Sequence, residues 1–472
     1  MTASPAGSHQ GAPAGSRLSR FADIRATIWL AAPISVALLV EMAMGVTEYA
    51  MAGRLGAAAF AAAGFGAQFL YVPKILAMGA LYAVAALGSH AHGAGKPDEL
   101  LRIVRQGLRL ATILSIPVML VMLSLGPVLR LFAARNPGFE LDIVAIEQLM
   151  WWALPSVMPF LWFQVLRSFV TVLGRPVAIT IIGLSILPVF VGMLYLLMYG
   201  AFGWYGMGVP SIGLATTLIS WLQLGLGILY VRRFEPFASY PIFAYLRDSD
   251  GKLLKEMLVV GAPIAGAYLF ETGMFFGSTA AMAGFGTDAL AAHNIVLNVT
   301  SIIFMIPYAL GQAGTVRVGW ALGAGRAQDA RQAGLTAIGL ALLWMLFGAL
   351  VMWQAPVLLA GFYLDLDDIG NAAALAVAVT LFPIAAIFQF FDGLQVSALG
   401  ALRGYKDTQV PMVIAFFGYW VIGIGGGIVM AYTFDVRGPG VWWGLAIGLL
   451  ASGTLLLLRF QHISRRHLPI PA

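Results

Sequence analysis

The sequence predicts an all-α integral membrane protein with twelve transmembrane helices, and its composition is the first observation behind that prediction. Of its 472 residues, 60% are hydrophobic and only 10% are charged, whereas a soluble domain carries about 25% charged residues. The apolar residues form runs of roughly 20, which is the length that crosses a bilayer as a helix. Alternating ten-residue strands, which would indicate a barrel, are not a feature of the sequence. We therefore expect the lipid bilayer to surround this chain.

Twelve hydrophobic runs, separated by polar or Gly- and Pro-containing segments, are the predicted spans. The first six lie near residues 27–50, 60–88, 106–127, 147–172, 177–200 and 210–231. The second six lie near residues 257–281, 289–318, 333–354, 371–400, 409–433 and 439–459. An even number of spans places both termini on the same side of the membrane.

Lysine and arginine predict which side that is. They concentrate in one alternate set of loops by about five to one, and the other set contains only Arg54, Arg130, Arg135 and Arg437. Loops rich in basic residues stay in the cytoplasm, so both termini are expected to be cytoplasmic. Residues 1–26 are predicted to form a disordered tail, and residues 461–472 a second tail. The basic residues are spread between helices rather than gathered on one face, so no nucleic-acid partner is expected.

The two halves of the chain resemble one another at an offset of about 230 residues. Three pairs of matching segments occur in the same order: APISVALLVEMAM (32–44) with APIAGAYLFETGM (262–274), MAG (51–53) with MAG (282–284), and HGAGK (92–96) with LGAGR (322–326). Six spans in each half make these parallel repeats. We expect an N-lobe over residues 27–231, a cytoplasmic linker over 232–256 and a C-lobe over 257–460.

Four carboxylates fall inside predicted spans: Glu41, Glu48, Glu271 and Asp392. A charge at the bilayer centre costs about 2.5–3.5 kcal/mol on insertion scales, so such a group faces a cavity or a partner. Each acid could bind a mobile ion or, as the alternative, tie helices together in a neutral, hydrogen-bonded form. Lys74, inside the second span, could pair with Glu41 or Glu48. The matching C-lobe segment, 301–311, has no basic residue, which favours Glu271 and Asp392 as the working pair.

Asp392 has an aromatic and an amide neighbour on the same helix face. Phe388 lies one turn before it and Gln395 almost one turn after it. An aromatic ring beside a carboxylate suits an organic cation through cation–π attraction, so both residues are candidates for lining a substrate cavity. In the alternative interpretation, Phe388 faces the core or the lipid.

The sequence resembles the multidrug and toxic compound extrusion (MATE) family, in its NorM-like bacterial branch. The resemblance rests on GVTEYAMAG (45–53), LFETGMFFGSTAAMAGFGTDALAAHNIVLN (269–298) and FQFFDGLQVSALGALRGYKDT (388–408), and it covers residues 27–460. It implies two six-helix lobes that form a V around a cavity for organic cations in the bacterial inner membrane. It also implies that Glu271 and Asp392 form the C-lobe cation site and that Glu48 replaces a usual aspartate. A tyrosine often helps to line that site, but the nearby Phe304 and Phe388 lack a hydroxyl.

We interpret the chain as a secondary active exporter of hydrophobic organic cations, not an enzyme, that acts as a monomer without a cofactor. An inward-moving Na⁺ or H⁺ would bind at Glu271 and Asp392. Na⁺ is favoured slightly because Asn298 could add an amide oxygen, and hard cations prefer oxygen ligands. The first alternative is a flippase for a lipid-linked precursor, whose cavity should be rich in Arg and Lys. The second is an ion channel, which the two-lobe repeat argues against.

Overall fold

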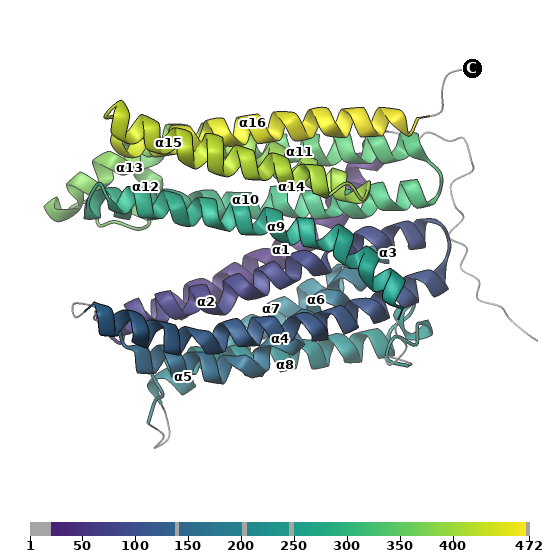
Figure 1. The fold of residues 1–472 in the computed structure, drawn as a ribbon, viewed down its shortest axis with the longest axis horizontal. Coiled ribbons are helices and arrows are strands. Elements are labelled where there is room, and N and C mark those ends of the chain that lie inside the picture. Colours follow the sequence, from purple (N-terminus) through teal and green to yellow (C-terminus); the bar gives the residue numbers. More distant parts are fainter. Residues whose placement is uncertain (1–19, 137–140, 201–204, 245–249, 469–472) are drawn as a thin grey trace, which may run out of the picture.

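The computed structural model describes residues 20–136, 141–200, 205–244 and 250–468, and its regular elements are helices (Figure 1). Twelve of the described helical segments are long and apolar enough to cross a membrane. The N-lobe spans are α1 (Arg20–Gly53), α2 with α3 (Ala57–Leu81, Ala83–Gly93), α4 (Pro97–Arg135), α5 with α6 (Ile143–Ala153, Val157–Val172), α7 (Val177–Tyr199) and α8 (Pro210–Arg233). The C-lobe spans are α9 (Gly251–Ala283), α10 (Thr287–Gly323), α11 (Ala327–Gln354), α13 (Ala372–Gly404), α14 (Gln409–Phe416) with the π-helical turns that follow it, and α16 (Arg437–Arg466).

Several helices extend beyond the apolar runs, and this shortens the expected tails and linker. Residues 20–26 already belong to α1 and residues 251–256 to α9, while α16 continues to Arg466. Asp250 fixes the early start of α9, because its carboxylate accepts a hydrogen bond from the Leu253 N–H at 3.0 Å, as an N-cap residue does. Residues 1–19, within the predicted N-terminal tail, lie outside the described part of the chain.

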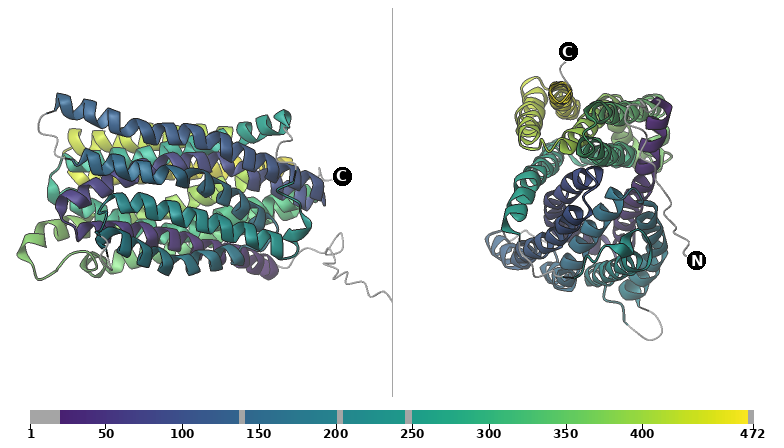
Figure 2. Two further views of the ribbon diagram at one scale, coloured as in Figure 1. Left: turned by 90° about the horizontal axis from the view of Figure 1, so that it is seen from below. Right: turned by 90° about the vertical axis from the view of Figure 1, so that its right-hand side faces the viewer.

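The two lobes form a V. Figure 1 shows the C-lobe helices (green to yellow) above and the N-lobe helices (purple to blue) below, and the two groups diverge toward the left of the view. Helix α1 begins and α16 ends at the opposite end of the bundle, which we call the termini end (Figure 2). The ends of the N-lobe and C-lobe helices therefore meet at the termini end and separate at the other, which we call the open end.

At the termini end the lobes touch backbone against backbone. A Cβ atom on Gly93 of α3 would lie 2.1 Å from the Trp320 carbonyl oxygen, and one on Gly323 of α10 would lie 2.1 Å from the His90 carbonyl oxygen. The Trp320 indole N–H donates to the Val172 carbonyl oxygen at 2.9 Å, which ties α10 to the end of α6. Only glycine allows helices to approach this closely, so these glycines hold the termini end shut.

A buried ion pair locks the same end. Asp23 in the first turn of α1 is 3% exposed and accepts hydrogen bonds from Arg317 of α10 and Thr336 of α11. The Arg317 guanidinium also donates to the Thr27 hydroxyl and, at 3.0 Å, to the Asp23 carbonyl oxygen. Both charges are thus compensated across the boundary between the lobes.

Gly323→Val is expected to open the termini end by overpacking the crossing of α3 and α10, at a cost of about 1–3 kcal/mol. The chain contains no cysteine, so a single Thr171→Cys reporter, which is 7% exposed beside this crossing, measures the opening. Labelling of that thiol by a water-soluble maleimide should rise severalfold in Gly323→Val. Gly339→Ala is the control, because nothing lies within 4 Å of a Cβ there. Unchanged labelling in Gly323→Val would show that the glycines do not close this end.

The eleventh span combines α14 with π-helical turns over Phe417–Gly425 and Val429–Thr433. It packs on α16 through glycines: a Cβ on Gly444 would lie 2.2 Å from the Gly427 Cα atom, and one on Gly448 would lie 2.4 Å from the Gly418 carbonyl oxygen. π-helical turns occur mostly at functional sites. Here the first of them carries Tyr419 into the interior of the C-lobe, where the residue is 0% exposed.

Candidate functional site

The C-lobe acid pair joins α9 to α13. Asp392 is buried and Glu271 is half-buried, and the two carboxylates lie close enough for the charge of one to act on the other. Neither takes part in an ion pair within the described ranges. The predicted pair is therefore brought together without a cation in direct contact, and it leaves negative charge for a mobile one.

Arg403 modifies the expectation that no built-in cation acts on this pair. Its guanidinium lies within electrostatic range of Glu271, although the two groups form no ion pair. The sequence analysis did not identify Arg403, because only segment 301–311 was compared with the segment around Lys74. Arg403 belongs instead to the last turn of α13. One buried positive charge therefore lies within electrostatic range of the acid pair.

Three uncharged polar side chains are buried in the same lobe. Gln389 and Gln395 flank Asp392 on α13 and are 1% and 0% exposed, and their amide groups have no hydrogen-bond partner within the described residues. The Tyr419 hydroxyl is likewise buried and unpartnered in that part of the chain, and both carboxylates act on it electrostatically. An unsatisfied buried polar group costs about 1–3 kcal/mol. Tyr419 is thus a tyrosine hydroxyl near the acid pair, which sequence reasoning had not found.

The structure decides between the two interpretations of Phe388 in favour of the core. The ring is 1% exposed and packs edge-on against Phe275 and Trp442, at centroid distances of 6.3 and 5.4 Å. It therefore lines no cavity here, which corrects its assignment as a substrate-contacting residue. Gln395 is also buried, so its amide faces the lobe interior.

Phe304 and Asn298 lie on α10 at different degrees of exposure. Phe304 is half-buried, and its ring stacks on that of Tyr308 with 5.8 Å between the ring centroids. Asn298 is exposed, and its amide nitrogen donates to the Asn294 carbonyl oxygen at 2.9 Å. That bond leaves the Asn298 amide oxygen available as a ligand.

In the N-lobe, Arg167 of α6 pairs with Glu41. Its Nη1 atom donates to the Glu41 carboxylate at 2.8 Å, so the interpretation that Lys74 neutralises Glu41 is wrong. Lys74 instead donates to the Ser156 hydroxyl at 2.7 Å. Sequence reasoning overlooked Arg167. It is an isolated basic residue within a predicted span, and the same feature that drew attention to Lys74 could have identified it.

Glu48 is the most enclosed of the N-lobe acids. It is 2% exposed and accepts a hydrogen bond of 2.7 Å from the Tyr71 hydroxyl. The Lys74 ammonium acts on Glu48 electrostatically without forming an ion pair. Lys74 also lies 5.5 Å from the centroid of the Phe160 ring. Glu48 therefore fits the alternative in which a hydrogen-bonded acid ties helices together. The C-lobe acids, for which no such contacts are found in the described residues, fit that alternative less well.

A chain of three tyrosines crosses from one lobe to the other. The Tyr82 hydroxyl, at the junction of α2 and α3, lies 2.9 Å from the Tyr308 hydroxyl on α10. Tyr308 lies in turn 2.7 Å from the Tyr268 hydroxyl on α9, and Arg403 packs over the Tyr268 ring at 5.2 Å. Polar contacts therefore continue inward from the closed termini end.

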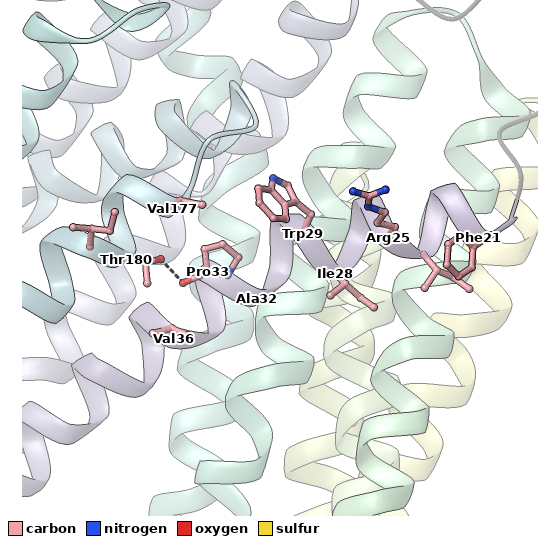
Figure 3. Close-up of a pocket in the computed structure, with 11 residues that line it drawn as sticks. Phe21, Arg25, Ile28, Trp29, Ala32, Pro33, Val36, Val177 and Thr180 are labelled. Atoms are coloured by element: carbon pink, nitrogen blue, oxygen red, sulfur yellow. Dashed lines mark hydrogen bonds between the residues drawn. The ribbon is translucent and has the colours of Figure 1, made fainter.

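An apolar groove of about 560 Å³ follows α1 where it meets α7 (Figure 3). The Thr180 hydroxyl donates to the Pro33 carbonyl oxygen at 2.6 Å at the point where the two helices meet. Phe21, Trp29 and Ile181, which line the groove, are 78%, 67% and 58% exposed. Such a surface suits lipid, and Arg25 is its one charged lining residue, so the groove does not provide a cation site.

Comparison with known proteins relates this chain to described transporters. The MatE family profile matches residues 33–196 and again 263–429, once in each lobe. The chain is 36% identical over 451 residues to the probable multidrug resistance protein NorM of Mesorhizobium japonicum, covering 94% of each chain. It is 36% identical over 438 residues to the multidrug resistance protein NorM of Burkholderia vietnamiensis, covering 92% of this chain and 93% of that one.

Solved structures share the fold. The Vibrio cholerae MATE transporter VcmN in its bent form superposes with a TM-score of 0.82 at 18% identity, covering 95% of this chain and 98% of that one. An outward-facing multidrug resistance MATE family transporter of the MOP superfamily superposes with a TM-score of 0.84 at 16% identity, covering 95% and 97%. At these identities the structural likeness shows the fold alone.

Proposed function

Because this chain belongs to the MatE family, we propose that it is a secondary active multidrug exporter of the bacterial inner membrane. It exchanges hydrophobic organic cations for an inward-moving cation. The names of its curated relatives, which are multidrug resistance proteins, support the transport of drugs. The acid pair supports the coupling to a cation.

The observation that carries the proposal is the pairing of Glu271 with Asp392 inside the membrane. Two carboxylates without an ion-pair partner in the described residues are costly in hydrocarbon unless a cation or protons neutralise them. The Tyr419 hydroxyl supplies an uncharged oxygen ligand near them. Phe304 and Phe388 have no hydroxyl and cannot supply one. An all-oxygen set of this kind suits a hard cation such as Na⁺.

The transport cycle follows from the closed termini end. With that end cytoplasmic, as the distribution of Lys and Arg predicts, this conformation faces outward. In it the half-buried Glu271 is the accessible member of the pair, so an external cation reaches Glu271 first. Movement of one charge down the membrane potential supplies about 2.3 kcal/mol per 100 mV, which drives the return to the inward-facing state that collects the next drug molecule.

The coupling ion is tested in everted vesicles or proteoliposomes with one gradient imposed at a time. With the pH gradient collapsed, a Na⁺ gradient directed opposite to drug movement should accelerate efflux of a dye such as ethidium. Tyr419→Phe should weaken this dependence on Na⁺, because it removes an oxygen ligand while keeping the ring. If only a pH gradient drives transport, the coupling ion is H⁺. If neither gradient does, or a lipid-linked pyrophosphate is moved instead, the exporter proposal fails.

A further inference from the structure

Where the two lobes meet, a small enclosed cavity of about 20 Å³ brings together two buried arginines. Its polar lining residues are Tyr82, Gln164, Arg167, Ser168, Thr171, Gln312, Thr315 and Arg403. We propose that this cavity binds one small monovalent anion of the size of chloride, and that the anion bridges the lobes while the termini end is closed. This site is separate from the acid pair, and it involves neither the drug nor the coupling ion.

Of the two guanidiniums that line the cavity, only one has an ion-pair partner among the described residues. Arg167 of the N-lobe and Arg403 of the C-lobe are 6% and 8% exposed. Arg167 is balanced by Glu41. Arg403 forms no ion pair within the described part of the chain: it packs on the Tyr268 ring and donates to that hydroxyl at 3.4 Å. Glu271 acts on Arg403 only at a distance. A buried guanidinium without a direct ion-pair partner is expensive, and an anion in the cavity would supply that partner.

The unsatisfied groups that line the cavity are donors. The Nη2 atom of Arg167 and the Nε2 atom of Gln312 are buried and have no hydrogen-bond partner among the described residues. The Thr315 hydroxyl, by contrast, is already used, since it donates to the Gly400 carbonyl oxygen at 2.7 Å. Free N–H groups beside two guanidiniums suit an occupant that only accepts hydrogen bonds. A halide ion has this property, whereas a cation would be repelled.

The volume limits the occupant further. One water molecule needs roughly 10–15 Å³ of such space, so a cavity of about 20 Å³ accommodates a single monatomic ion. Phosphate and organic anions are too large, which also separates this site from the pyrophosphate cavity that a lipid flippase would need.

The site exists only while the lobes are together, and this gives the anion an effect on conformation. Arg167 lies on α6 and Arg403 on α13, so separation of the lobes at this level moves the two guanidiniums apart and divides the cavity. A ligand that binds only one conformation stabilises that conformation, and the stabilisation grows with the logarithm of the ligand concentration once this exceeds the dissociation constant. Chloride should therefore stabilise the conformation with the termini end closed.

The test is a chloride titration of the purified transporter at constant Na⁺, pH and ionic strength, with gluconate as the replacing anion. Thermal stability should rise with the logarithm of the chloride concentration above the dissociation constant, and bromide should substitute for chloride. Arg403→Gln should abolish this dependence, and Gln312→Leu should raise the chloride concentration needed for a given stabilisation by about tenfold, the value of one charge-assisted hydrogen bond. Arg459→Gln, which removes an arginine paired with Asp407 outside the cavity, should titrate as the unmodified protein does.

A second variant keeps the proposal testable if Arg403→Gln does not fold. Gln312→Glu places a carboxylate at the cavity, so this variant should be as stable in gluconate as the unmodified protein is in chloride, and it should no longer respond to chloride. A chloride response that persists in Arg403→Gln or Gln312→Glu, or an equal response to gluconate, would overturn the proposal. In that case the cavity holds water or a nonspecific ion only.

Discussion

Glu271→Gln and Asp392→Asn are each expected to abolish cation-coupled efflux while leaving the protein folded and inserted. Each change removes one negative charge and keeps the shape of the side chain. Neither acid is held by an ion pair in the described structure, so the loss of the charge removes a cation ligand without breaking a direct contact between opposite charges. Initial rates of dye efflux under an imposed gradient should fall by two orders of magnitude or more, roughly the loss of 3 kcal/mol of ion binding.

The matched control is Asp288→Asn. Asp288 lies in the first turn of α10 and is exposed, so the same change of charge outside the site should leave efflux unaffected. Thermal stability of all three variants should stay near that of the unmodified protein. Glu271→Gln with normal coupled efflux would remove this residue from the cation site and would contradict the proposed mechanism.

Asp23→Leu is expected to release the termini end of the V. It leaves the buried Arg317 guanidinium without its carboxylate, and breaking a buried pair in this way costs about 3–5 kcal/mol. The whole cost falls on the conformation in which α1 contacts α10, so the balance of conformations should shift by a factor of roughly a hundred or more. The Thr171→Cys reporter should then react readily with a water-soluble maleimide, and efflux should slow because the conformation with the termini end closed is depleted.

Two further variants distinguish the loss of this ion pair from a general loss of stability. Asp329→Leu removes one partner of the surface pair between the exposed Arg326 and the half-buried Asp329, and it should cost less than about 1 kcal/mol. Asp23→Leu combined with Arg317→Met removes both buried charges and should recover much of the closed state. If the double variant labels as readily as Asp23→Leu alone, the ion pair does not hold this end together.

The spans and the acid pair could be predicted from the sequence because each differs in hydrophobicity from the residues next to it. Apolar runs of membrane length stand out in any window, and so does a carboxylate such as Glu271 within one of them. The pair Asp23–Arg317 joins residues that are 294 positions apart, and nothing near either residue indicates its partner. Contacts of this kind depend on how the lobes pack.

Tyr419 and Phe388 show a second limit of sequence reasoning. A tyrosine in an apolar span has no contrast with its surroundings, and a π-helical turn changes which face it occupies, so helical spacing could not assign it to the site. Phe388 was placed beside Asp392 by that same spacing. The helix face was correct, but it packs against Phe275 and Trp442 inside the lobe rather than bordering a cavity.

The glycine crossing at Gly93 and Gly323 has a consequence for the energised cell. Because backbone lies directly against backbone there, no side-chain rotation can admit a file of water between α3 and α10. Protons move readily along such a file, so a looser seal would let protons leak across the membrane while the termini end is closed. Variants that loosen the crossing should therefore be toxic to the cell in proportion to their expression.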